Sequence, residues 1–99
     1  MQAWERLVRN STLECLWPYV LSILKTRPMH AYLLRNEIEK RFGFRPGRVT
    51  AYKVLYKLKR EGLVRAKRAG RKEVYSLTPQ GLKELERAKK YWAGLARKL

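Results

Sequence analysis

The residues of this 99-residue chain that could do chemistry are mainly cations, and they are concentrated in one segment. The chain has 24 Lys and Arg residues against 8 acidic residues, all Glu, and its formal net charge is +16. Residues 40–72 hold 13 of these cations and a single acid, whereas residues 1–39 hold 5 cations and 4 acids and residues 73–99 hold 6 cations and 3 acids. This distribution predicts a polyanionic partner, because a surface charged only for solubility would mix Lys and Glu along the chain.

Five of these cations fall in a segment with helical periodicity, residues 48–61. At 100° per residue, one face of this helix is apolar, and the opposite face carries Val49, Thr50, Lys53, Tyr56, Lys57 and Arg60. Lys can donate to guanine and Thr can contact a thymine methyl group. The spacing therefore predicts that Thr50, Lys53 and Lys57 read base edges in the major groove.

A second group of residues is suited to the DNA backbone, which supplies affinity and register but no sequence information. Tyr52 lies on the apolar face, where we expect it to be mainly core with its hydroxyl at the rim, and Tyr56 lies on the outer flank. The expected backbone contacts are Arg48, Tyr52, Tyr56, Lys59, Arg60, Lys67, Arg68, Arg71 and Lys72.

The sequence offers no catalytic set. There is one His, one Cys, no Asp and three isolated Ser residues, so no nucleophile, base or metal cluster can be assembled, and we expect no cofactor and no metal. His30, at a helix start, is interpreted as a capping or packing residue. The single thiol, Cys15, excludes an intrachain disulfide, and no apolar run is long enough to span a bilayer. We therefore expect a cytoplasmic protein that associates with the nucleoid and not with a membrane.

One domain of this length must position these residues. Residues 1–10 form a short amphipathic arm, and Ser11 to Glu14 match a capping box that opens a helix over residues 11–26. Pro18 leaves the start of this helix open between Ser11 and Trp17, since a proline in a helix interior removes a hydrogen bond.

The remaining segments alternate apolar periodicity with breakers. A helix over residues 29–42 is followed by a Gly-Phe-Arg-Pro-Gly turn and then by the basic helix 48–61. Residues 63–77 predict a hairpin with a basic tip, and Thr78-Pro79 caps a helix over residues 79–99. This order predicts a mainly α fold with a small β-hairpin, the winged helix-turn-helix, with an added N-terminal arm and C-terminal helix.

The two terminal segments carry apolar side chains that a winged core does not require, and a second copy of the chain is the simplest partner for them. The expected dimer interface consists of Trp4, Leu7, Leu82, Leu85, Ala88, Trp92, Leu95 and Leu99. The residues thus predict a dimeric, double-stranded DNA-binding regulator. A non-specific architectural protein that coats DNA is the main alternative, because the charge fits it equally well, and an RNA-binding protein is a weaker one.

Several motifs resemble the PadR-like transcriptional regulators over roughly residues 13–89. Pro28-Met29-His30-Ala31-Tyr32 is similar to the opening of the family's second helix, and Pro46-Gly47, Tyr52 and Glu61-Gly62-Leu63-Val64 are similar to its recognition helix and wing. Arg71-Lys72-x-x-Tyr75-x-Leu77-Thr78-x-x-Gly81 is similar to the end of the wing. Ala31 replaces a usual glycine, and Arg48 to Ala51 add residues before Tyr52.

The resemblance implies a homodimer that is joined through the C-terminal helix and the N-terminal segment. This dimer would bind a palindromic operator, commonly as a repressor. It also implies that a small aromatic effector could enter near Trp17, Tyr91 and Trp92.

Overall fold

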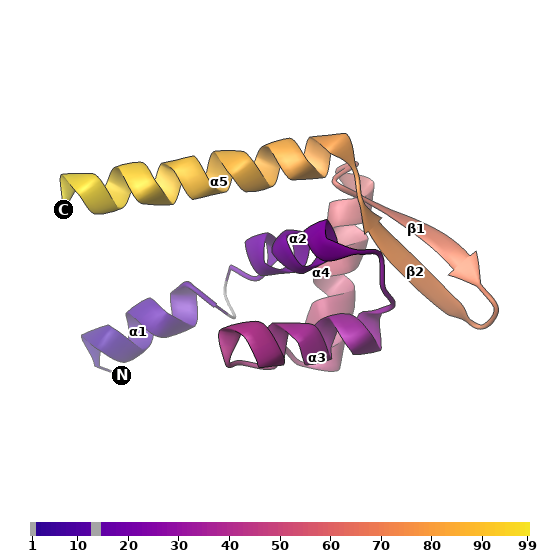
Figure 1. The fold of residues 1–99 in the computed structure, drawn as a ribbon. Helices are drawn as coiled ribbons and strands as arrows, with labels where there is room; N and C mark the ends of the chain where they lie inside the picture. The colour runs from indigo at the N-terminus through magenta and orange to yellow at the C-terminus, as the bar shows by residue number, and fades with distance from the viewer. Residues whose placement is uncertain (1, 13–14) are drawn as a thin grey trace.

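A hairpin protrudes from a core of helices in the computed structural model, which describes residues 2–12 and 15–99 (Figure 1). Its elements are α1 (Ala3–Asn10), α2 (Trp17–Thr26), α3 (Ala31–Phe42), α4 (Arg48–Arg60), β1 (Val64–Ala69), β2 (Lys72–Leu77) and α5 (Pro79–Lys98). The predicted fold class, mainly α with a small β-hairpin, is confirmed.

The core is organised around α2, which contacts α3, α4, α5 and β2. Five of the ten residues of α2 are buried, and α2 is the most apolar helix among the residues that the structure describes. The side chains that are almost fully buried include Val20, Leu21, Ile23, Leu34, Ile38, Leu55 and Val64. Burying them stabilises the fold by roughly 1.5–3 kcal/mol per large aliphatic side chain, and it fixes the orientation of α4.

The helix predicted over residues 11–26 begins at Trp17 and not at Ser11. Pro18 stands in its first turn, where backbone N–H groups have no partner within the helix, so the missing N–H costs nothing. A start at Ser11 would have placed Pro18 in the helix interior. The predicted capping box reaches residues 13 and 14, which lie outside the described residues.

Local signals end and begin the other helices, although α3 begins at Ala31 and not at Met29 as predicted. Gly43 closes α3 with a left-handed backbone, φ +82°. The end of α4 is a Schellman motif, in which Leu63 N–H donates to the Leu58 carbonyl at 2.9 Å and Gly62 N–H donates to Lys59 at 3.1 Å. The hydroxyl of Thr78 accepts from Gly81 N–H at 3.0 Å, which confirms Thr78 as the N-cap of α5.

The two strands form an antiparallel hairpin in which Val64 pairs with Leu77 and Ala69 with Lys72. Only Gly70 and Arg71 remain in the turn between the two strands. An isolated bridge joins the base of this wing to the segment before α3: Met29 N–H donates to the Tyr75 carbonyl at 3.0 Å, and Tyr75 N–H donates back at 2.9 Å. The wing is therefore anchored to the helix-turn-helix.

Helix α1 and the C-terminal half of α5 extend from the core in the same direction, away from the hairpin (Figure 1). No residue of α1 is buried. The hydroxyl of Tyr19 donates to the Ser11 carbonyl and ties the end of this arm to α2. Within residues 2–12 and 15–99, no helix has both the length and the hydrophobicity that crossing a membrane requires.

Candidate nucleic-acid interface

Helix α4 presents its polar face to solvent. Ala51, Leu55 and Leu58 are buried against the core, which leaves the face with Thr50 and Lys53 exposed. Gly47 caps the helix with extended backbone, and the first turn contains no acidic residue. The predicted base-reading residues therefore share one exposed helical stripe that no side chain of the described chain covers.

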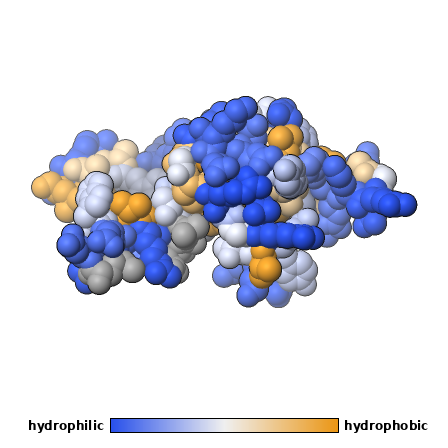
Figure 2. Space-filling view, turned by 90° about the horizontal axis from the view of Figure 1, so that it is seen from below, coloured by the Kyte–Doolittle hydropathy of each residue, from blue (hydrophilic) through white to orange (hydrophobic). Residues whose placement is uncertain are grey.

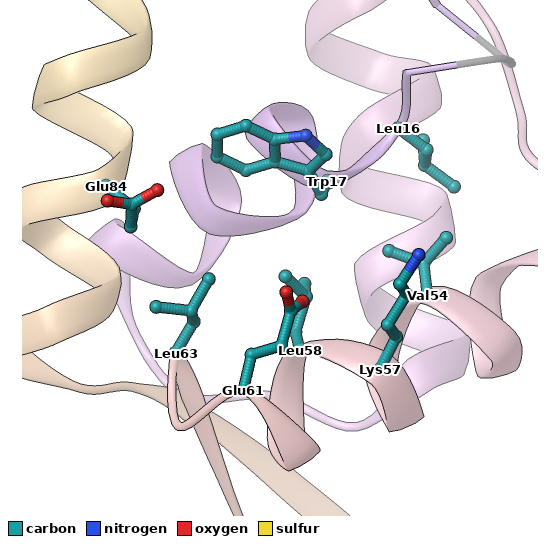
Figure 3. A pocket seen from close by; sticks show the side chains of 8 residues that line it. All are labelled: Leu16, Trp17, Val54, Lys57, Leu58, Glu61, Leu63 and Glu84. Carbon is teal, nitrogen blue, oxygen red and sulfur yellow. The ribbon is translucent and has the colours of Figure 1, made fainter.

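Lys57 also borders a cavity on the side of α4 that faces α2 and α5. This cavity has a volume of about 380 Å³, and its apolar wall is formed by Leu16, Trp17, Val54, Leu58 and Leu63. Figure 3 shows the Trp17 ring above this cavity, Glu84 reaching in from α5, and Lys57 and Glu61 rising from the end of α4. Lys57 thus lies at the border between the exposed stripe and the core of the domain.

The tyrosines of α4 are both exposed. The prediction that Tyr52 lies mainly in the core is wrong, because 47% of its surface is accessible. Helical periodicity places it toward the core, but the neighbouring elements cover only the strip centred on Leu55. Tyr56 is exposed as well, and the Arg60 guanidinium lies over its ring at 5.8 Å. Both hydroxyls are free to face solvent or a ligand.

The wing carries its cations on exposed positions. Lys67 and Arg68 lie on β1, Arg71 lies in the turn, and Lys72 opens β2, and all four are exposed. Arg48, Lys59 and Arg60 of α4 are exposed too. Except for Arg60 over Tyr56, the described residues give these cations no ion-pair, hydrogen-bond or ring partner, so their charge is available to an anion.

A hollow of about 260 Å³ joins the wing to the helix-turn-helix. It is lined by His30, Ala31, Tyr32, Tyr52, Arg71, Lys72, Glu73 and Tyr75. Because Tyr52 of α4 and Arg71 of the wing border the same hollow, the two elements share one surface. This juxtaposition brings together residues predicted separately.

The hollow also contains a residue that the sequence analysis did not select. Tyr32 is 63% exposed in the first turn of α3 and stacks on His30 at 6.5 Å. The sequence could have identified Tyr32 as an exposed residue, because Ala31, Leu34 and Ile38 define the buried face of α3 and Tyr32 lies outside that face. His30 is the N-cap of α3, where its Nδ1 accepts from Leu33 N–H at 3.4 Å, as its capping interpretation expected.

At the base of the hollow, burial raises the pKa of Tyr75 to about 12. The Tyr75 hydroxyl also donates to Glu73 at 3.0 Å, and the charges of Glu73 and Tyr52 act in the same direction. Tyr75 therefore stays protonated and neutral at physiological pH and braces the wing as a hydrogen-bond donor.

The face that carries α3 is largely hydrophilic in Figure 2, and orange groups gather mainly toward the end where α1 projects. Within residues 2–12 and 15–99, no three His, Cys, Asp or Glu side chains come together as a metal site would require. The chemistry offered here is the binding of a polyanion.

The predicted dimer residues fall on the two projecting helices. Trp4 and Leu7 of α1 are exposed, as are Leu82, Trp92 and Leu95 of α5 and Leu99 directly after it, and Ala88 is half-buried. Leu85 is the exception and is corrected here: only 4% of it is accessible, because it belongs to this chain's own core. Leu85 lies on the same face of α5 as the exposed apolar residues, but α5 packs against α2 at this position.

The three residues predicted to surround an effector do line one cavity. Its volume is about 290 Å³, and its walls are Cys15, Trp17, Glu84, Arg87, Ala88, Tyr91 and Trp92. Trp17 and Glu84 also border the cavity beside Lys57, so these two side chains separate neighbouring hollows.

A family sequence model and several solved structures are similar to this chain. The sequence model of the transcriptional regulator PadR-like family matches residues 20–87, more than half of the chain. No curated protein matches the chain in sequence.

Solved structures match over most of their length. A candidate transcriptional regulator of Thermoplasma acidophilum is 30% identical, with a TM-score of 0.72 over 83% of this chain and 82% of that one. A PadR family transcription regulator of Clostridium difficile is 21% identical, with a TM-score of 0.75 over 82% and 90%. F93 from STIV, a winged-helix DNA-binding protein, is 23% identical, with a TM-score of 0.73 over 82% of this chain and 90% of that one.

Proposed function

The chain belongs to the transcriptional regulator PadR-like family, and from this premise we propose that it represses transcription by binding a palindromic operator as a homodimer. Members of this family are transcriptional regulators and not enzymes, and their winged-helix fold binds DNA. The operator symmetry, the dimer and the sign of regulation are the proposed part.

The observation that carries the proposal is the hollow bordered by both Tyr52 of α4 and Arg71 of the wing. A recognition helix in the major groove and a wing on the adjacent backbone need one continuous surface. In this arrangement Thr50, Lys53 and Lys57 read bases. Arg48, Lys59, Arg60, Lys67, Arg68, Arg71 and Lys72 bind phosphates together with the hydroxyls of Tyr52 and Tyr56.

The test is selection of bound sequences from a random duplex pool at near-physiological salt. We expect an inverted repeat to be selected, and we expect the protein to bind it at least about 10³-fold more tightly than a scrambled duplex. No enrichment, with an affinity that collapses steeply as salt rises, would favour a protein that coats DNA without sequence preference.

Two variants test whether α4 reads the base sequence while the wing binds the DNA backbone. Lys53→Ala should reduce the preference for the selected sequence, whereas Arg71→Ala should weaken all duplexes alike and lower the slope of log affinity against log salt by about 1. Equal losses on every sequence from both variants would contradict the assignment.

The dimer proposal is supported by the projecting helices, since α1 buries nothing within its own chain and 71% of Trp4 is accessible. Sedimentation equilibrium tests it. Leu95→Glu places a charge in the exposed apolar stripe of α5 and should yield monomers. Ala93→Glu adds the same charge off the stripe and should leave a dimer. A wild-type monomer at micromolar concentration would exclude the proposal.

The effector proposal rests on the cavity between Trp17, Tyr91 and Trp92, whose aromatic walls suit a small aromatic ligand. Indole is a suitable probe. We expect it to release the selected operator from the wild type and not from Trp17→Leu, and unchanged operator binding in both would contradict this part.

A further inference from the structure

The turn between α3 and α4 is held by two arginines that point in opposite directions along the chain. Arg35, on α3, donates from Nε to the carbonyl of Pro46 in the turn at 3.0 Å. Arg45, in the turn, reaches back to α3, where its Nη1 donates to Asn36 and to Glu39 Oε1, the latter at 3.3 Å. The two contacts form a reciprocal clasp between one helix and one turn.

The guanidinium of Arg45 has its principal partners within the chain. Besides Asn36 and Glu39, the ring of Tyr32 lies 5.7 Å from the Arg45 Cζ atom. Its side chain is 29% exposed, less than that of Glu39. Arg45 is therefore a cation of the basic segment that differs from the wing cations, which are exposed and unpaired among the described residues.

The clasp acts on the residues from which α4 starts. Pro46 is fully buried, and Phe44 packs edge-on against Tyr19 of the core at 5.0 Å. Arg45 lies between these two anchors, and α4 begins at Arg48, three residues later. The direction in which α4 leaves the turn is thus set by three successive anchored residues.

We propose that Arg45 is a positioning residue, which orients the recognition helix through Asn36 and Glu39 and does not serve as a phosphate contact. The inference rests on the proposed sequence-specific DNA binding, because orientation matters most where side chains must meet particular base edges. A merely basic surface would tolerate a tilt of α4.

Removing the two side chains that accept hydrogen bonds from Arg45 tests the proposal. A phosphate contact and a positioning role for Arg45 predict opposite changes in operator affinity. The double variant Asn36→Ala/Glu39→Ala makes the protein more positive and releases Arg45. If Arg45 served phosphate, every duplex would be bound more tightly. If it positions α4, we expect affinity for the selected operator to fall about three- to tenfold, the effect of charge-assisted hydrogen bonds between partly exposed groups.

A matched control comes from the same helix. Glu37→Ala removes the same charge from α3, and the Glu37 side chain has no hydrogen bond or ion pair to another described residue. It should bind operator and scrambled duplex slightly more tightly, through charge alone. On the scrambled duplex the double variant should behave like this control. Tighter operator binding by the double variant would overturn the proposal.

Substitution of Arg45 itself gives a second readout. Arg45→Lys keeps the charge but loses the planar guanidinium, whose Nη1 meets Asn36 and Glu39 while its Cζ lies over the Tyr32 ring, so it should weaken operator binding about as much as Arg45→Ala. Neither variant should change the salt slope. A fall of about 0.9 in the slope for Arg45→Ala, restored by Lys, would identify a phosphate contact and refute positioning.

Amide hydrogen exchange in the free protein separates this proposal from the proposed function. If the wild type bound all duplexes equally, sequence-specific regulation would fail. The clasp would still predict faster exchange of Ala51 N–H, which donates to the Gly47 carbonyl at 2.9 Å in the first turn of α4, in the double variant but not in Glu37→Ala. Equal exchange rates in the two variants would refute the clasp on their own.

Discussion

A single methyl group at Gly81 should destabilise the whole domain, because the first turn of α5 packs directly on the end of α4. A Cβ atom at Gly81 would lie 2.1 Å from the Leu63 carbonyl oxygen and 2.6 Å from Leu77 Cδ1. The Leu77 side chain can rotate, but the Leu63 oxygen is backbone. Since real Cβ contacts are essentially never under 3.0 Å, α5 and the turn must separate by almost 1 Å.

The size of the effect follows from what that separation loosens. Thr78 N–H donates to the Leu63 carbonyl at 3.2 Å, and the Thr78 hydroxyl donates to the Gly62 carbonyl at 2.7 Å. Overpacking costs about 1–3 kcal/mol, and loosening the two bonds costs about 1 kcal/mol each. The better helix propensity of Ala returns about 1 kcal/mol. We therefore expect Gly81→Ala to lower the free energy of unfolding by about 2–4 kcal/mol.

Thermal unfolding followed by circular dichroism, at one fixed protein concentration, measures this loss. At roughly 4–8 °C per kcal/mol, Gly81→Ala should lower Tm by at least about 8 °C. The control is Gly94→Ala on the same helix, where the nearest atom to the new Cβ is Arg97 Nη2 at 3.9 Å. It should raise stability by about 0.5–1 kcal/mol. A Tm for Gly81→Ala within about 2 °C of the wild type would refute the reasoning.

Two further predictions concern the junction of α5 and the base of the wing. Thr78→Val removes the N-cap of α5 and the bond to Gly62, and it should cost about 1–2 kcal/mol in urea unfolding, whereas Thr78→Ser should cost less. Burial and Glu73 raise the pKa of Tyr75 from 10.0 to about 12, so the folded state holds this proton more tightly than the unfolded state. The free energy of unfolding should therefore fall as pH rises from about 10 to about 12, and this fall should be smaller in Tyr75→Phe. Parallel pH curves for the two proteins would contradict the assignment.

Features that depend on a few consecutive residues could be read directly from the sequence. Gly43 closes α3, and Thr78 with Pro79 opens α5, as predicted, because a cap is a local competition between backbone and side chain. The basic stripe of α4 and the hairpin also follow from periodicity and turn residues. The choice between Ser11 and Trp17 as the start of α2 stayed open in the sequence, because the capping box and Pro18 favour different starts.

The features that the sequence could not predict depend on which surfaces pack against one another. Periodicity gives the angle of Tyr52 around its helix, but only packing decides how wide a strip is covered, and Tyr52 lies beyond it. Leu85 shares its helical face with exposed residues, yet α2 covers it. Arg45 lies in a turn, and its acceptors lie six and nine residues away on α3, at a separation that no local pattern encodes. The sequence alone therefore determined the elements, their charge and their family. Tertiary packing decided which side chains stay free to meet DNA, because burial and pairing depend on contacts between segments far apart in the chain.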